Sequence, residues 1–285
     1  MPLRKVQMGK LPDDLLDAVM HHHRCYSVGL GRVRDNNPET YTPLGTGTLV
    51  RRRKLFGILT ARHCLHACNP SVRIGHKGGD TMFFLLRNNV TVQVPAEGLI
   101  EHTLCKPKCE EYGPDLVFVE IIPGELLDLV KAIGSFWPMD QDVKALMRKY
   151  GKPTVPICFV GFPEEDYACH VKDKSIYVNH RHMTYFGVIE KGDICEHDGW
   201  DYLESKFNYN QSKELPDSFA GVSGGALWAV ELRGGETKSD PITIRKAVLI
   251  GVTFYEIYRK RNIARLRAHF IRSIYELAWL RMRIK

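Results

Sequence analysis

Short stretches of β-type sequence form two series on either side of a helical segment, and this arrangement constrains the fold most strongly. The first series spans residues 25–122 and includes "GTGTLVRR", "LFGILTA" and "DLVFVEII", separated by turn residues. The second spans residues 154–255 and includes "TVPICFVGFP" and "AVLIGVTFY". Between them, residues 124–150 change to helical spacing around a proline. Two sets of short strands around a connector predict two β-barrels.

Both ends of the chain are predicted to be helical. Residues 11–23 carry acids in the first turn and His21–His23 in the last, as the helix dipole favours, and this run is more typical of a helix end than of a metal site. From Asn262 onward, apolar residues recur at helical spacing and predict an amphipathic helix on the second barrel: Ile263, Leu266, Phe270, Ile274 and Leu277. We therefore expect an all-β fold with flanking helices in five segments: an N-terminal extension (1–23), a first barrel (24–135), a helical connector (136–151), a second barrel (152–258) and a basic C-terminal helix (259–285).

The positive charge of the chain is concentrated at its C-terminal end. The net charge is +7, but residues 259–285 alone carry +8, because they contain nine Lys or Arg and one Glu. Because one segment carries the excess charge, the sequence does not predict a nucleic-acid-binding protein. Two roles stay open for the helix: packing alone, or packing together with docking of an acidic partner. The composition is typical of a soluble globular protein, and the sequence contains neither a membrane-length apolar run nor a secretory signal. We expect a cytoplasmic protein.

Three residues in separate segments have the side chains that nucleophilic catalysis requires. Ser223 lies among glycines in "GVSGGAL", where the backbone can turn tightly. His63 follows an apolar strand in "ILTARHC", and Asp115 opens another in "DLVFVEII". A serine nucleophile needs a base such as histidine, and a carboxylate can orient that base. The residues occur along the chain in the order His, Asp, Ser.

The segments around these residues resemble the signature segments of the trypsin-like (chymotrypsin-fold) serine proteases. The similar segments "GTGTLV", "GILTARHC", "DLVFVEI", "FVGFP", "GVSGGAL" and "LIGVTFY" occur in the order of the family and cover roughly residues 25–280. A G-x-S-G-G motif alone is weak, but its combination with the His and Asp segments is specific. The sequence resembles bacterial, intracellular members more than secreted digestive ones. The resemblance implies two six-stranded antiparallel β-barrels with the active site between them.

The resemblance also implies a serine endopeptidase that acts on protein or peptide substrates through an acyl-enzyme, without a cofactor. Ser223 would attack the scissile carbonyl, His63 would carry the proton, and Asp115 would orient the imidazole. The backbone N–H groups of Gly221 and Ser223 would form the oxyanion hole. The alternative is a binding or scaffold module that has the protease fold but no turnover. Substituted triad residues mark such proteins, and all three residues are present here.

Departures from the secreted members concern activation and redox state. Val222 stands where those members carry an aspartate that binds a newly cleaved amino terminus, so we do not expect zymogen activation. A regulatory protein partner is the other route, by analogy with processing enzymes of bacterial stress and defence systems. Cys64 has the position of a disulfide-bonded cysteine, but its partner region "GTGTL" has none, which favours a reduced protein. Ala226 replaces the usual proline, with no chemical consequence expected.

Residues that would set substrate preference have two interpretations each. In trypsin-type members, an aspartate at the offset of Asp217 lies at the base of the specificity pocket and selects Lys or Arg. The segment "LPDS" is also typical of a surface turn. Thr253, Phe254 and Tyr255 have the position of the strand that pairs with substrate backbone, but aromatic residues there can equally belong to the core.

Four cysteines at two C-x-x-x-C spacings are a weaker candidate for structural zinc: Cys64, Cys68, Cys105 and Cys109. Four thiolates suit tetrahedral zinc, and the resemblance places one pair after the catalytic His and the other before the catalytic Asp. This spacing is looser than the usual C-x-x-C, and buried free cysteines are common. We therefore expect no metal.

Overall fold

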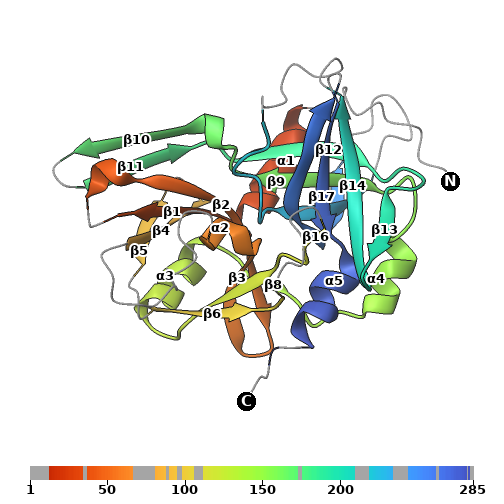
Figure 1. Cartoon of the computed structure of the whole chain (residues 1–285), viewed down its shortest axis with the longest axis horizontal. Helices are drawn as coiled ribbons and strands as arrows, with labels where there is room; N and C mark the ends of the chain where they lie inside the picture. The colour runs from red at the N-terminus through yellow and green to blue at the C-terminus, as the bar shows by residue number, and fades with distance from the viewer. Residues whose placement is uncertain are drawn as a thin grey trace.

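The computed structural model describes residues 13–34, 37–66, 81–87, 90–94, 98–105, 112–172, 175–208, 218–233, 243–260, 263–280 and 282. Within these residues, strands dominate and form two large sheets with a few helices around them (Figure 1). Strand pairs are antiparallel except for one short parallel pair in the first sheet. The predicted fold class, all-β with flanking helices, is confirmed.

The first sheet brings together the strands that precede and follow the candidate His and Asp. Its order is β5-β4-β1-β2-β3-β7-β6, and β8 pairs with β2 in parallel. Because β3 and β7 are neighbours, Thr60 at the end of β3 pairs with Val117 at the start of β7. The strands are β1 Ser27–Val33, β2 Thr42–Arg52, β3 Leu55–Thr60, β4 Thr81–Leu86, β5 Val90–Val94, β6 Leu99–Thr103, β7 Val117–Ile121 and β8 Trp137–Pro138.

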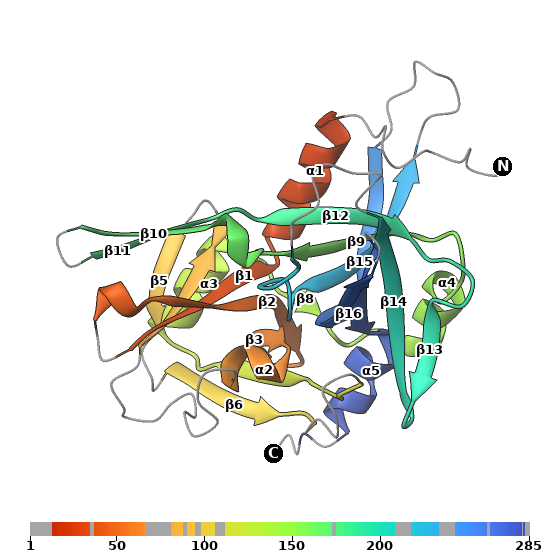
Figure 2. The ribbon, with the colours of Figure 1, turned by 45° about the horizontal axis from the view of Figure 1, so that its top comes forward.

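The second sheet has the order β12-β9-β15-β16-β17-β14-β13. Its apolar face packs around the fully buried Trp228, Phe159 and Leu249. Its strands are β9 Pro156–Gly161, β12 Met183–Val188, β13 Ile194–His197, β14 Trp200–Asn208, β15 Ala226–Arg233, β16 Thr243–Lys260 and β17 Ile263–His269. A separate hairpin, β10 Tyr167–Lys172 and β11 Ser175–His180, extends from this half alongside the first sheet (Figure 2), where Val178 packs with Leu85 of β4.

The sheets contain eight and seven strands in the described residues, where six each were expected. The sequence analysis did not identify β6, β8, β10 and β13, and it predicted a helix in place of β17. Strand β6, "LIEHT", contains mostly polar residues, and only Leu99 in it is buried. Strand β8 has two residues, and β13 is a short edge strand without a buried residue. Such strands lack the period-two apolar pattern on which sequence recognition depends.

Helices α1 Asp13–Arg24, α3 Glu125–Ile133 and α4 Val143–Tyr150 occur where helical spacing was found. Helix α1 ends with the histidine run, and its last histidine is buried: the His23 ring stacks on Trp228 with centroids 4.9 Å apart. The run therefore packs the helix against the second sheet. None of the helices in the described residues is long and apolar enough to cross a bilayer.

The predicted helix over residues 259–285 is wrong in its first part, because Ile263–His269 is strand β17. Helix α5 covers only Ile271–Tyr275, followed by a short 3₁₀ turn, Leu277–Trp279. The second sheet thus extends beyond the expected boundary at residue 258. Two periodicities overlap here: Leu266, Phe270 and Ile274 recur every four residues, but Ala264, Leu266 and Ala268 alternate and are buried on one face. Pairing with β14 and β16 decides in favour of the strand.

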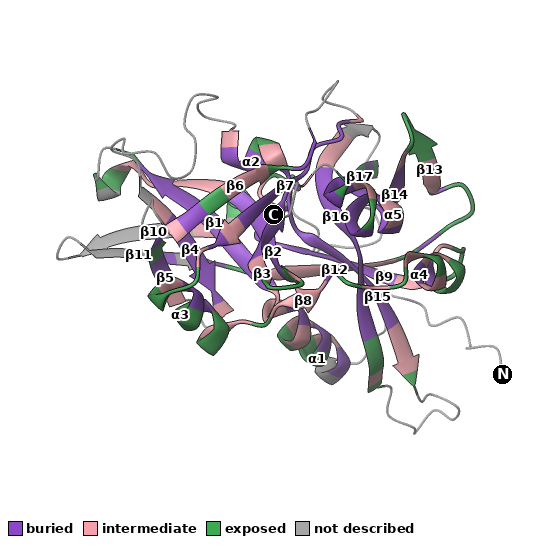
Figure 3. Ribbon diagram, turned by 90° about the horizontal axis from the view of Figure 1, so that it is seen from below, coloured by how far each residue is buried: buried purple, intermediate pink, exposed green. Residues whose placement is uncertain are grey.

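The two halves are joined by buried side chains and backbone. Figure 3 shows that buried residues concentrate in the strands, whereas α3 and α4 carry exposed surface. Trp137 of the first sheet donates its indole N–H to the Tyr275 hydroxyl at 2.8 Å, and that hydroxyl donates to the Leu249 carbonyl of the second sheet at 2.7 Å. The residues discussed next lie on the same boundary between the sheets.

Candidate active site

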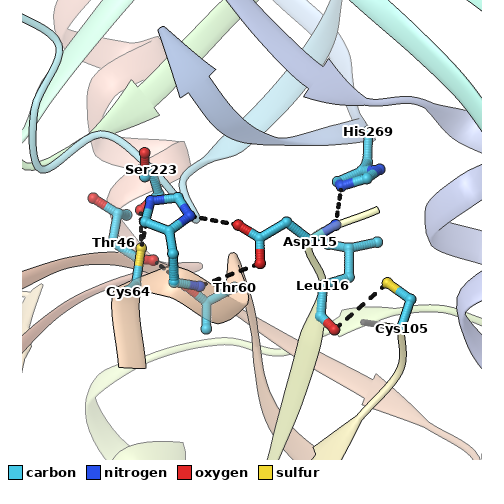
Figure 4. Close-up of polar contacts among 9 residues, drawn as sticks. Thr46, Thr60, Cys64, Cys105, Asp115, Leu116, Ser223 and His269 are labelled. Atoms are coloured by element: carbon cyan, nitrogen blue, oxygen red, sulfur yellow. Dashed lines mark hydrogen bonds and ion pairs between the residues drawn. The ribbon is translucent and has the colours of Figure 1, made fainter. Parts of the chain in front are cut away.

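His63 and Asp115 are brought together by the neighbouring strands β3 and β7. His63 lies in the short helix α2 Arg62–His66 just after β3, and Asp115 lies two residues before β7. The His63 Nδ1 and the Asp115 Oδ2 are 2.5 Å apart, and the His63 backbone N–H donates to Oδ1 at 3.2 Å (Figure 4). The two carboxylate oxygens therefore fix both the ring and the backbone of His63.

The two residues differ in exposure. The Asp115 side chain is 9% exposed, whereas that of His63 is 46% exposed, so the imidazole can be reached from solvent. Burial lowers the pKa of His63, but the neighbouring Cys64 sulfur and the Asp115 carboxylate raise this pKa by more, so the net shift is upward. A buried carboxylate that stabilises imidazolium is the arrangement that a proton-carrying histidine needs.

Ser223 lies in a turn, residues 219–225, in which every carbonyl accepts a hydrogen bond. Two bonds come from Thr46 of the first sheet, whose Oγ1 donates to the Gly221 carbonyl at 2.7 Å and whose N–H donates to the Ser223 carbonyl at 2.9 Å. The other donors are the N–H groups of Val222, Glu164, Gly225 and Thr253 and the Thr48 hydroxyl, which serve the carbonyls of Phe219, Ala220, Val222, Gly225 and Gly224 in that order.

The same turn leaves two amides without partners. Within the described residues, the N–H groups of Gly221 and Ser223 donate no hydrogen bond, whereas those of Val222, Gly224 and Gly225 do. These two are the amides that were predicted to form the oxyanion hole. Because the surrounding carbonyls are held elsewhere, these two N–H groups remain available to an external acceptor.

Glycine is required at two positions within this turn. Gly221 has φ 86°, and a Cβ there would lie 2.4 Å from the Phe162 carbonyl oxygen. Gly224 has φ 83°, and its Cβ would lie 1.9 Å from the Thr46 carbonyl oxygen. An L-residue would meet both backbone strain and a clash at each position. Gly224 thus lets the Ser223 turn lie against β2 of the first sheet, and Gly221 lets it lie against the segment that follows β9.

One sulfur atom connects Ser223 and His63. The Cys64 thiol donates to the Ser223 carbonyl at 3.2 Å and lies 3.8 Å from the His63 Nε2. No hydrogen bond between the Ser223 hydroxyl and the His63 ring occurs among the contacts of the described residues. In enzymes without bound substrate this bond is commonly long and tightens in the complex.

Of the predicted substrate-binding residues, three are described and Asp217 lies outside the described residues. Thr253 is buried, and its backbone N–H and carbonyl bond to Gly225 and Gly224. Phe254 is also buried, whereas Tyr255 is partly exposed. The backbone of Thr253 thus supports the Ser223 turn, and Phe254 belongs to the core.

The cysteines that were considered for zinc make other contacts. The Cys105 thiol donates to the Leu116 carbonyl at 3.7 Å, and Cys64 bonds to Ser223 as described. Cys68 and Cys109 lie outside the described residues, and no metal-binding group of three or more His, Cys, Asp or Glu occurs in the part of the chain that the structure describes. A Cβ at Gly45 would lie 2.7 Å from the Cys64 Sγ, so the missing disulfide partner corresponds in space to Gly45.

Sequence analysis missed two residues that support the site, Thr46 and His269. His269 is buried and accepts the Asp115 backbone N–H at its Nε2, at 3.1 Å. The segment containing it was predicted to be helical, so nothing in the sequence related it to Asp115. Thr46 lies in the quoted "GTGTLV" segment, but a threonine in a strand gives no signal of a bond to a turn 175 residues away.

Comparisons with known proteins add little beyond this geometry. No protein-family model matches the sequence, and no curated protein matches it. Among solved structures, the HtrA-type protease AlgW with a decapeptide is similar to this chain with a TM-score of 0.45 and 11% sequence identity. The alignment covers 90% of this chain and 64% of that one. The likeness is too distant to support an argument about function.

Proposed function

We propose that the chain is a serine endopeptidase that acts through Ser223, His63 and Asp115. The observation that carries the proposal is the Ser223 turn, where the carbonyls are held elsewhere and the Gly221 and Ser223 amides stay unpaired. Two donors that flank a bonded Val222 N–H in one turn are the arrangement that an oxyanion hole requires. The adjacent His63–Asp115 pair supplies the base and its orienting carboxylate.

The reaction follows from these positions. The Ser223 Oγ forms a bond to the scissile carbonyl carbon, and its proton passes to the His63 Nε2. The resulting oxyanion is bound by the Gly221 and Ser223 amides. The C–N bond then breaks as imidazolium protonates the leaving amine, and an acyl-enzyme remains. Water, deprotonated by His63, then attacks the ester carbonyl; the C–O bond to Ser223 breaks, the carboxylic acid leaves, and imidazolium returns the proton to the Ser223 Oγ. No metal or cofactor takes part in these steps.

A fluorophosphonate probe tests the proposal without knowledge of the substrate. The Ser223 Oγ displaces fluoride from phosphorus, so mass spectrometry should find the adduct on Ser223. Ser223→Ala should abolish labelling while its circular dichroism and melting temperature stay close to wild type. Ser218→Ala is a matched control, because Ser218 lies in the same region but is exposed and bonds to Glu256. Folded wild-type protein that resists labelling under all conditions would contradict the proposal.

The alternative is a scaffold module with the same fold and no turnover. The observation in its favour is the missing hydrogen bond between Ser223 and His63 in the described contacts. Hydrolysis of a mixed peptide library by wild type, absent in Ser223→Ala, separates the two. Library peptides left intact by a protein that also fails to label would favour the scaffold.

Cleavage after Lys or Arg is the specificity we propose if Asp217 faces the side chain of the substrate. A cognate cation would pair with the carboxylate, whereas a neutral side chain would leave it unpaired. Asp217→Ser should reduce cleavage after basic residues and leave fluorophosphonate labelling unchanged. An unchanged cleavage profile would contradict this assignment.

Activation by a protein partner, in a bacterial stress or defence system, is proposed by analogy alone. Val222 is fully buried and apolar, so it offers no carboxylate for a cleaved amino terminus. Substrate proteomics that compares wild type with Ser223→Ala would identify the pathway.

A further inference from the structure

His269 links the second sheet to the backbone of Asp115. It is the last residue of β17, and 154 residues separate it from Asp115 in the sequence. Its Nε2 accepts the Asp115 N–H at 3.1 Å, which Figure 4 shows on the side of Asp115 away from Ser223. Asp115 therefore holds His63 with its side chain and is held by His269 through its main chain.

The imidazole of His269 is kept neutral and in one tautomer. Because Nε2 accepts a hydrogen bond, the proton of the neutral ring must be on Nδ1. The Nδ1 atom is buried and has no hydrogen-bond partner within the described residues. Burial lowers the pKa of His269 to about 3, although the Asp115 charge opposes this shift. An unsatisfied buried donor destabilises the fold, so the histidine is costly at this position and an apolar residue would avoid that cost.

Aromatic residues of the second sheet fix the ring and the segment before Asp115. The His269 ring stacks on Phe254 with centroids 4.3 Å apart and lies 5.2 Å from Tyr202. Tyr202 donates its hydroxyl proton to the Tyr112 carbonyl at 2.6 Å. The segment 112–115 is therefore bonded to the second sheet at both ends, at the Tyr112 carbonyl and the Asp115 amide. Its position depends on the half of the molecule that carries Ser223.

We infer that His269 is a positioning residue for the candidate triad: its Nε2 sets the Asp115 backbone, and through it the carboxylate, at the distance that His63 requires. The inference deepens the proposed function and rests on it. Without the acceptor, the Asp115 amide would be buried and unpaired, and the segment would move to satisfy it. The carboxylate would move with the segment, because one residue carries both groups. An error of about 1 Å in such a pair can cost about 100-fold in rate.

Three variants test the inference. His269→Phe keeps an aromatic ring against Phe254 but cannot accept a hydrogen bond, and His269→Gln keeps an acceptor at a similar distance from the backbone. Tyr275→Phe is the matched control, because it removes a different hydrogen bond between the halves, the one that the Tyr275 hydroxyl accepts from Trp137. The readouts are the limiting rate of fluorophosphonate labelling at saturating probe and the proton resonance of His63 Nδ1–H.

We expect His269→Phe to lower the limiting labelling rate by about 100-fold, with little change in the half-saturating probe concentration. The His63 Nδ1–H resonance should move or broaden in His269→Phe and return in His269→Gln. Tyr275→Phe should lower the melting temperature and leave both readouts at wild-type values. Equal losses in all three variants would mean that His269 only stabilises the fold and would overturn the inference, as would wild-type rates in folded His269→Phe.

Measurements on the wild type keep the inference testable if His269→Phe does not fold. The ¹⁵N shifts of the His269 ring should report a proton on Nδ1, and a proton on Nε2 would overturn the inference. A wild-type protein that does not label would instead refute the proposed function. In that case, the His63 Nδ1–H resonance, compared between the wild type and the folded His269 variants, would still show whether His269 positions Asp115.

Discussion

The two halves of the candidate site are built by different means. On the first sheet, the side chains of His63 and Asp115 contact each other directly, and neighbouring strands bring them together. On the second sheet, Ser223 lies in a turn that is shaped by its main chain, with its carbonyls bonded to Thr46, Thr48 and surrounding amides. One half therefore depends on side-chain identity and the other on backbone conformation.

This difference predicts different consequences of substitution. A change of one carboxylate on the His63–Asp115 side alters proton chemistry without altering the path of the chain. A change on the Ser223 side acts through the orientation of peptide groups, even where the substituted side chain belongs to another strand. Each half also depends on the other, because Thr46 lies in the first sheet and His269 in the second.

Asp115→Asn should give the largest effect, because it removes the charge that stabilises imidazolium and favours the wrong His63 tautomer. We expect a loss of about 10⁴-fold in the rate of fluorophosphonate labelling, with the fold retained. Asp140→Asn is the control, since the Asp140 carboxylate accepts the exposed Arg53 N–H elsewhere on the first sheet. A loss below tenfold would break the comparison, because the His63–Asp115 side would then not depend on the carboxylate.

Thr46→Val should act on the Ser223 side through the backbone. It removes the hydroxyl that holds the Gly221 carbonyl, so the backbone of Gly221 can change conformation and turn its own N–H, one of the two predicted oxyanion donors, away from its position. Loss of one such donor costs about 10²–10³-fold in rate. Thr46→Ser should restore the rate, because it keeps the hydroxyl.

Thr48→Val provides the matched control on the same strand. Its hydroxyl reaches the Gly224 carbonyl only at 3.4 Å, and the N–H groups of Gly224 and Gly225 on either side of that carbonyl are both hydrogen-bonded. Labelling should stay near the wild-type rate. Equal effects of the two valine variants would show that strand packing, and not the backbone conformation of Gly221, determines the labelling rate.

The same contrast explains how far the sequence could predict the site. His63, Asp115 and Ser223 could be identified because their neighbouring residues form recognisable segments, and the glycines of the turn could be explained from backbone conformation. The roles of Thr46 and His269 could not, because each acts through one main-chain group far away in sequence. The same limit applies to strand β17, whose alternation of Ala264, Leu266 and Ala268 was obscured by larger apolar residues at helical spacing.

The pH dependence of labelling should show the upward shift in the pKa of His63. Labelling needs the neutral imidazole, so a raised pKa moves the acidic limb of the profile above pH 6.5. Cys64→Ser should move the limb to lower pH, because the sulfur next to Nε2 contributes to the shift. Cys105→Ser should not, since that thiol bonds to Leu116. A wild-type limb at or below pH 6.5 would show that the pKa of His63 is not raised, and that Cys64 and Asp115 do not outweigh the effect of burial.

The smallest expected effect concerns stability in acid, and it depends on His182, which contacts Ser27 of the first sheet. His182 is buried, lies 3.2 Å from the Ser27 hydroxyl at its Nε2, and has its pKa lowered to about 3 by burial and by Arg24. Because the unfolded chain binds a proton near pH 6.5 and the folded protein does not, the free energy of unfolding must fall as pH decreases from about 6.5 towards 3. The slope for one such histidine is about 1.4 kcal/mol per pH unit.

His182→Gln should remove this contribution, because glutamine can bond to Ser27 and does not titrate. Denaturant unfolding between pH 6.5 and pH 4 should therefore give a shallower loss of stability than in wild type. Fluorophosphonate labelling at neutral pH should be unchanged, since His182 contacts Ser27 and Phe162 and neither His63 nor Asp115. An unchanged slope would mean that His182 is already protonated in the folded state, and that its buried environment does not exclude charge. His269→Gln should also flatten this slope, because burial lowers the pKa of His269 to about 3 as well, but it keeps an acceptor for the Asp115 N–H. This variant therefore removes the contribution of His269 to acid stability without removing its positioning role.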